Sequence, residues 1–68
     1  MTKREIVYNY LLDAIVKKEY MAGDALNIGQ VAKECNVSDI PVREALRQLE
    51  GDGYIKITPQ HKAIVNGI

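Results

Sequence analysis

Hydrophobic residues recur at helical spacing in three separate segments of the chain. The first segment opens with the capping-box pair Thr2 and Glu5, and its apolar stripe predicts a helix over residues 3–18. The members of that stripe are Val7, Leu11, Ala14, Ile15 and Lys18, widened by Tyr8 and Leu12. The second segment predicts a shorter helix over residues 28–35, with Asn27 as its N-cap.

The third segment has the clearest helical pattern. Its apolar stripe, which follows the i, i+3, i+4, i+7 spacing of a buried helix face, consists of Val42, Ala45, Leu46 and Leu49. Ser38 or Asp39 caps this helix, and Pro41 lies in the first turn, where its missing N–H costs nothing. Gly53 is expected in the left-handed conformation that ends a helix. Together these features predict a helix over residues 38–52.

A small β-hairpin is expected after the third helix. Residues 54–58 alternate in the manner of a strand, and after a turn residues 63–65 return. Upstream, residues 25–28 could form a short extended segment. Only two residues separate the second and third helices, which is the spacing of a helix-turn-helix. The expected fold is therefore mainly α with a small β-hairpin: a winged helix-turn-helix, in one domain, with three helices and a two-stranded wing over residues 54–66.

The composition narrows the class of protein. The 68 residues allow one domain with a small core, and nine basic residues balance nine acidic ones. Because DNA-binding domains are often clearly basic, a DNA-facing surface here must be a local patch. A single cysteine, no long apolar run and no secretory signal favour a cytoplasmic protein without a membrane partner. With one His, one Cys and no metal-ligand spacing or phosphate loop, we expect no enzyme activity, metal or cofactor.

The outer face of the third helix carries most candidate DNA contacts. Ser38 could donate its hydroxyl to a phosphate while also capping the helix. Arg43 could bridge guanine O6 and N7 or clamp a phosphate; its alternative is an ion pair with Asp39. Arg47 could contact a phosphate or pair with Glu50.

Two residues at the start of this helix, and the tip of the wing, complete the candidate site. Asp39 stabilises the helix dipole, but near DNA it repels phosphate unless it accepts from cytosine N4. Ile40, on the outer face, could contact a thymine methyl group or pack on another protein. The wing tip contains Gln60, His61 and Lys62. His61 and Lys62 either meet the minor groove, where narrow segments attract cations, or stay solvated.

A long and specific motif surrounds the third helix. It consists of Leu26, then Val31-Ala32, then the run Val37-Ser38-x-x-Pro41-Val42-Arg43-Glu44-Ala45-Leu46-x-x-Leu49-Glu50-x-x-Gly53-Tyr54-Ile55. This motif resembles the N-terminal winged-helix domain of GntR-family bacterial transcription regulators, and the FadR-type branch most of all. The resemblance implies sequence-specific binding of double-stranded DNA, with the third helix in the major groove and the wing at the minor groove.

The resemblance also implies partners that lie beyond this domain. Family members bind a palindromic operator as homodimers, and a C-terminal domain senses a small-molecule metabolite. We expect that effector domain to be absent from these 68 residues, and the isolated domain to associate only weakly.

Departures from the family pattern leave a second interpretation open. Asp39 stands where members commonly carry Arg, Gly29 stands where the second helix often has a charged residue, and the wing tip lacks its usual Gly. The alternative function is a winged-helix protein-interaction module that has lost DNA binding. Zero net charge, Asp39 and Ile40 favour this alternative, whereas Arg43 and the basic wing disfavour it.

Overall fold

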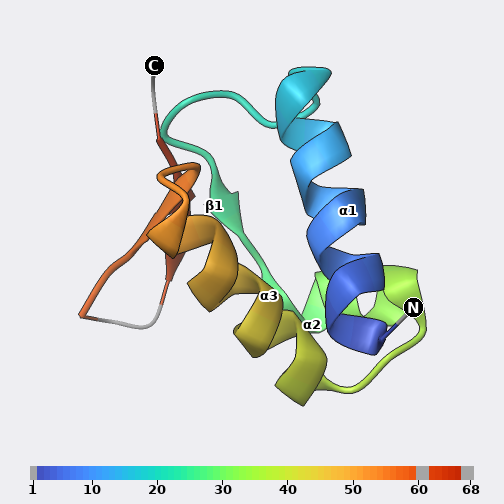
Figure 1. Ribbon diagram of the computed structural model, residues 1–68. Helices are drawn as coiled ribbons and strands as arrows, with labels where there is room; N and C mark the ends of the chain where they lie inside the picture. The colour runs from blue at the N-terminus through green and yellow to red at the C-terminus, as the bar shows by residue number, and fades with distance from the viewer. Residues whose placement is uncertain (1, 60–61, 67–68) are drawn as a thin grey trace.

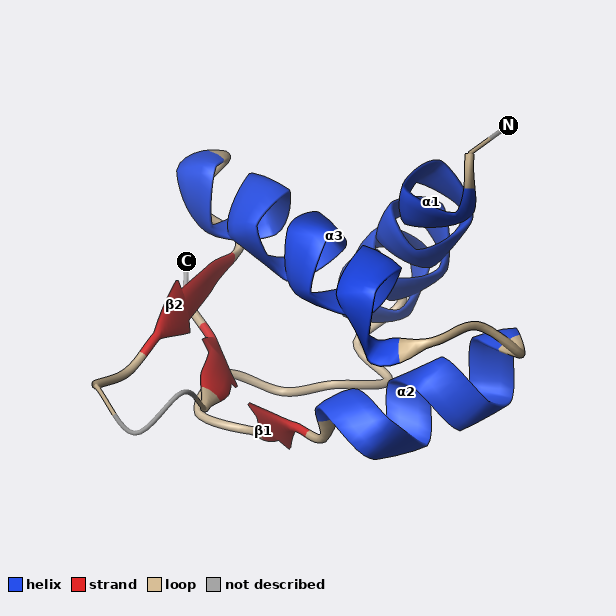
Figure 2. Ribbon diagram, turned by 90° about the horizontal axis from the view of Figure 1, so that it is seen from below, coloured by secondary structure: helices blue, strands red, loops and turns tan. Residues whose placement is uncertain are grey.

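A computed structural model of the chain describes residues 2–59 and 62–66. This part of the chain forms three helices and three short strands (Figures 1 and 2). In chain order they are α1 (Lys3–Val16), β1 (Ala25–Leu26), α2 (Ile28–Cys35), α3 (Asp39–Gly51), β2 (Ile55–Ile57) and β3 (Ala63–Val65). The winged helix-turn-helix predicted from the sequence is confirmed.

The helix starts follow the capping signals in the sequence. At α1 the Thr2 hydroxyl accepts from the backbone N–H of Glu5, and the Glu5 carboxylate accepts in return from the backbone N–H of Thr2. At α2 the side-chain oxygen of Asn27 accepts from the N–H of Gln30 at 2.9 Å. Ser38 holds the N-cap position of α3, but its side chain makes no capping hydrogen bond. Its hydroxyl is therefore left available to another partner.

The predicted end of the first helix, at residue 18, was wrong. The helix ends at Val16, and Lys18 adopts the left-handed conformation with φ of 63°. The N–H of Glu19 donates to the carbonyl of Ala14, and the N–H of Lys18 to that of Ile15. These two bonds end the helix in the pattern that usually has a glycine at the left-handed position. The apolar stripe gave no sign of this ending, because no Gly or Asn stands there.

The third helix is also one residue shorter at each end than the predicted range 38–52. Ser38 and Asp52 are its caps rather than members, and Gly53 follows with φ of 89°. The N–H of Tyr54 then donates to the carbonyl of Leu49 at 3.0 Å. The left-handed glycine thereby turns the chain directly from α3 into the wing.

The β structure contains a strand that the two-stranded prediction lacked. The strands form an antiparallel sheet in the order β1-β3-β2, with Ala25 opposite Ile64 and Lys56 also opposite Ile64. The extended segment before α2 therefore joins the wing, and this anchors the wing to the helix-turn-helix. Leu26 is buried by this pairing.

The core lies where α1, α2, α3 and the sheet meet, and α3 is at its centre. In Figure 2, α3 runs between α1 on one side and β2 on the other. The stripe of α3 is almost completely inaccessible: Val42, Ala45, Leu46 and Leu49 are 0–2% exposed. Val7 and Leu11 of α1 and Ile55 of β2 join them. Within the described residues, no helix has the length and apolar character needed to cross a bilayer.

Candidate nucleic-acid interface

The outer face of α3 is exposed to solvent, whereas the opposite face packs in the core. Asp39, Ile40, Arg43 and Arg47 are all exposed. The side chain of Ile40 is 69% exposed, more than any other large hydrophobic residue in the described part. The structure thus brings together the four α3 residues that the sequence predicted as contacts, next to Ser38 at the helix start.

Neither arginine of α3 forms an ion pair with any residue that the structure describes. Within residues 2–59 and 62–66 the one ion pair joins Lys17 to Asp13, at 3.2 Å on α1. The alternatives considered from sequence, Arg43 with Asp39 and Arg47 with Glu50, are therefore not formed. Their absence leaves both guanidinium groups free to bind an external anion or base edge.

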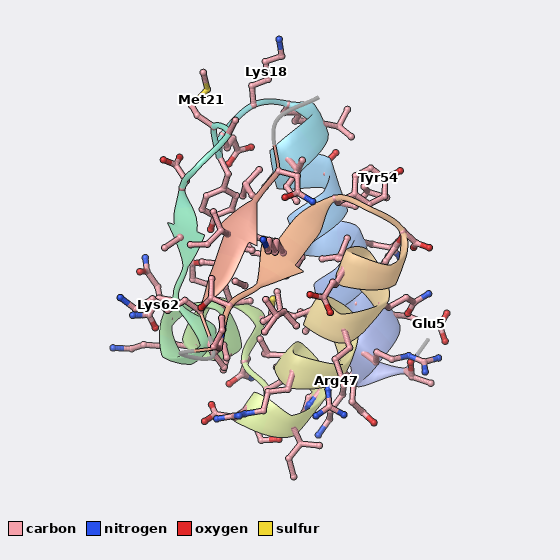
Figure 3. All side chains as sticks on the ribbon, turned by 90° about the vertical axis from the view of Figure 1, so that its left-hand side faces the viewer. Glu5, Lys18, Met21, Arg47, Tyr54 and Lys62 are labelled. Atoms are coloured by element: carbon pink, nitrogen blue, oxygen red, sulfur yellow. The ribbon has the colours of Figure 1, made fainter. Side chains whose placement is uncertain are left out.

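Both arginines line one shallow hollow at the junction of α3 with the wing. The hollow is bounded by Ile28, Arg43, Leu46, Arg47, Ile57 and Ala63. In Figure 3, which faces the sheet, Arg47 projects from α3 below the strands, and Lys62 lies beside the lower end of β3. Arg43 and Arg47 therefore share this hollow with Ile57 and Ala63 of the wing.

The start of α1 adds two basic residues to this surface. Thr2, Lys3 and Arg4 line a groove together with Pro41 and Glu44 of α3. The beginnings of α1 and α3 lie at the same end of the molecule in Figure 1. The sequence alone left open whether Lys3 and Arg4 touch DNA backbone or are merely solvated, because only packing of α1 on α3 places them beside the first turn of α3.

Two hydrogen bonds between Thr58 and Lys62 close the turn of the wing. The N–H of Thr58 donates to the carbonyl of Lys62 at 2.8 Å, and the N–H of Lys62 donates to the Thr58 hydroxyl at 3.2 Å. The Lys62 side chain is exposed. Gln60 and His61, the other predicted wing contacts, lie outside the described residues.

Two tyrosine hydroxyls of α1 donate hydrogen bonds to carboxylates. The hydroxyl of Tyr8 donates to Asp52 at 2.6 Å, and that of Tyr10 donates to Glu34 at 3.0 Å. These hydrogen bonds, with desolvation, raise the pKa of each tyrosine to about 12. The two tyrosines thus link α1 to the end of α3 and to α2, which favours a structural role over base stacking.

Other reactive groups do not assemble into a site. Burial, with a smaller contribution from the charge of Glu34, raises the pKa of the Cys35 thiol, which disfavours the reactive thiolate. In the described ranges, no three His, Cys, Asp or Glu side chains come together to hold a metal ion.

Comparisons with known proteins agree with this arrangement. Residues 3–65 match the family model described as bacterial regulatory proteins, gntR family. A curated relative is the uncharacterized HTH-type transcriptional regulator YdhC of Bacillus subtilis (strain 168). It is 43% identical over 49 residues, which cover 72% of this chain and 22% of YdhC.

Solved structures share both the fold and part of the sequence. A GntR family transcriptional regulator from Pseudomonas syringae pv. tomato str. DC3000 matches with a TM-score of 0.85 and 33% identity, over 97% of this chain and 28% of that one. Lar, which controls the expression of the Listeria monocytogenes agr system, matches with a TM-score of 0.90 and 30% identity, over 98% of this chain and 31% of its own.

The chain spans less than a third of the length of each of these relatives. The family consists of transcription regulators rather than enzymes. Assignment to the FadR-type branch stays a prediction. The family match and the helix-turn-helix together show that this chain belongs to the GntR family of bacterial regulatory proteins and forms the helix-turn-helix domain of that family.

Proposed function

We propose that this domain binds double-stranded DNA sequence-specifically, with α3 in the major groove and the wing at the minor groove. The observation that carries the proposal is the pair of exposed arginines on α3, Arg43 and Arg47, which make no ion pair in the described part of the chain. A guanidinium without a protein partner can bind guanine O6 and N7 or a phosphate bidentately.

The proposed contacts divide into base readers and phosphate binders. Arg43 reads a guanine, Ile40 packs on a thymine methyl group, and Asp39 accepts from cytosine N4. Ser38, whose hydroxyl makes no cap bond, and Arg47 bind phosphates. Lys62 serves the minor groove together with Gln60 and His61, which are included on the sequence alone.

One such domain alone should bind DNA weakly. Neutralising about three or four phosphates gives a slope of log K against log salt of roughly −3. We propose that the full-length regulator is a homodimer that places two of these domains on a palindromic operator, so that the second domain binds at high effective concentration. A metabolite bound by the remainder of that regulator would then change the spacing of the two domains.

An NMR titration of the labelled domain tests the proposal. The duplex is first enriched from a random-sequence library with the wild-type domain, and binding is measured at low and at near-physiological salt. We expect shifts in Ser38–Arg47 and around Lys62 that fade as salt rises, since phosphate contacts are screened. Absence of shifts at low salt, or shifts spread over α2 and the far end of α1, would contradict the proposal.

A protein-contact function is the second candidate, and the exposure of Ile40 favours it. The two functions respond differently to Asp39→Arg. Where no cytosine donates to Asp39, this change replaces a carboxylate that repels phosphate with a cation at the start of α3, so it should strengthen binding to a mixed-sequence duplex at low salt. A pure protein-interaction module would show no DNA binding before or after the change.

A further inference from the structure

Glu50 makes an unusual contact for an exposed residue at the end of a DNA-facing helix. It lies in the last turn of α3, and its carboxylate accepts a hydrogen bond from the backbone N–H of Ile57, at 2.8 Å. Ile57 is the last residue of β2, which is an edge strand in the order β1-β3-β2. A side chain of α3 thus reaches across to the distal end of the wing's first strand.

The edge position explains why this hydrogen bond is available. The next amide, that of Thr58, points inward and donates to the carbonyl of Lys62 on the partner side of the hairpin. Successive amides of a strand point in opposite directions, so the Ile57 amide faces outward. Unpaired outward amides are the usual weakness of an edge strand. Here the Glu50 carboxylate occupies that donor.

The residue that Glu50 holds is connected to both groups of proposed DNA contacts. The side chain of Ile57 lines the hollow that Arg43 and Arg47 also line. Its neighbour Thr58 is joined to Lys62 by two hydrogen bonds, one through the backbone and one through the Thr58 hydroxyl. A displacement of Ile57 would therefore change both the hollow that Arg43 and Arg47 line and the position of Lys62.

Other contacts hold β3 and the near end of β2: β3 pairs with β1, where Leu26 lies opposite Ala63. The side-chain amide of Asn66 donates to the carbonyl of Gly53 at 3.1 Å, and the N–H of Asn66 donates to the carbonyl of Tyr54 at 3.0 Å. Gly53, in the left-handed conformation, is the point at which the wing departs from α3. Without Glu50, β2 would keep this corner and its pairing with β3, but the outer edge of β2 at Ile57 would lose its hydrogen bond to α3.

We infer that Glu50 is a positioning residue, which holds the wing at the angle to α3 where both elements contact one duplex. This inference rests on the proposed function. The negative charge of Glu50 opposes DNA binding. The inference therefore requires that holding the wing in place strengthens binding by more than this charge weakens it.

Two pairs of variants with matched charge isolate this hydrogen bond. Glu50→Asp keeps the negative charge but is one methylene too short, and is compared with wild type. Glu50→Gln keeps an acceptor oxygen without the charge, and is compared with Glu50→Ala. In each pair we expect the member without the bond to bind the enriched duplex about 2- to 10-fold more weakly, the range of one hydrogen bond. Glu44→Gln, on the same helix, reports the effect of charge alone.

A structural role would change stability, whereas a positioning role also requires coupling to the wing. We therefore repeat both comparisons in a Lys62→Ala background, where the difference within each pair should become smaller because one wing contact that depends on Glu50 is gone. Urea unfolding of every variant confirms that the domain is folded during the binding measurement. Equal affinities within both pairs, or differences that keep their full size without Lys62, would overturn the inference.

The same experiment separates this inference from the proposed function. If Arg43→Ala weakens binding while the Glu50 pairs are equal, only the positioning role fails. If Arg43→Ala leaves DNA binding unchanged, the proposed DNA surface fails, and the role of Glu50 fails with it.

Discussion

The recognition helix α3 and the wing belong to one proposed surface, but they are held in place by different means. The helix is fixed by a stripe of side chains that are 0–2% exposed, at the centre of the core. The wing strands are only three residues long. Ile55, Ala63 and Val65 reach the core, but the turn beyond the strands is held by hydrogen bonds of Glu50 and Thr58. Packing therefore fixes the base-reading element along its whole length, whereas the turn of the wing is held by a few polar contacts.

The largest expected effect comes from breaking the packing of α3. Leu49→Ala removes a fully buried side chain and leaves a cavity, so it should lower the free energy of unfolding by about 2–5 kcal/mol. Ile57→Ala, at a half-buried position of the wing, should cost clearly less. Urea unfolding measures both, and exposed Gln48→Ala should stay within about 0.5 kcal/mol of wild type. Similar losses for Leu49 and Ile57 would remove the proposed difference between the two regions.

The next effect concerns DNA and not stability. Arg43→Ala should weaken binding to the enriched duplex by about 1–3 kcal/mol and relax the preference at one base pair. Fluorescence anisotropy with the duplex and its single-base variants measures both quantities. Lys17→Ala, which removes a cation on α1 that is paired with Asp13, is the control. An equal loss of affinity for every duplex would make Arg43 a phosphate contact instead of a base reader.

A smaller effect is expected in the wing. Lys62→Ala should weaken binding to all duplexes to a similar degree and reduce the salt slope by about 1, because one phosphate contact is lost. Anisotropy titrations over a range of salt concentrations give this slope. An unchanged slope would show that Lys62 is simply solvated, and would confine the DNA surface to the helices.

The smallest effect is a pH dependence at the corner between α3 and the wing. The hydrogen bond to Asp52 raises the pKa of Tyr8 from 10.0 to about 12 in the folded state, so folding favours the protonated phenol. This contribution is complete below pH 10 and is lost as the pH rises from about 10 to 12. The difference in unfolding free energy between wild type and Tyr8→Phe should shrink over that range. A constant difference would contradict the sign of this linkage.

Local sequence patterns predicted most of the fold because they report on neighbouring residues. The capping box at Thr2, the Asn27 cap and the left-handed Gly53 all appear in the structure as predicted. The stripe of α3 was also correct, since a 3.6-residue period directly specifies which face is buried. The end of α1 was missed because Lys18 takes a backbone conformation for which its side chain gives no signal.

The sequence predicted which residues the candidate site contains but not which ion pairs and hydrogen bonds they form. The exposed positions of Ile40, Arg43 and Arg47 follow from the same helical period that buries Leu46 and Leu49. Whether the arginines pair with neighbouring acids depends on side-chain rotamers at the surface, where alternatives differ by only about 0–1 kcal/mol. Among the described residues neither arginine forms an ion pair, and Glu50 accepts a hydrogen bond from the wing instead.

The amino-acid sequence by itself determined the three helices, the turn between α2 and α3, and the face of α3 that carries the proposed contacts. Only the tertiary structure decided that β1 pairs with β3, that Lys3 and Arg4 flank the start of α3, and that Glu50 ties the wing to that helix. The reason is one of distance along the chain. Helical periodicity and capping act within a few residues, whereas the first two contacts join distant segments that only the packing of the hydrophobic core brings together. The Glu50–Ile57 contact is shorter in sequence, but it depends on how the chain turns from α3 into β2.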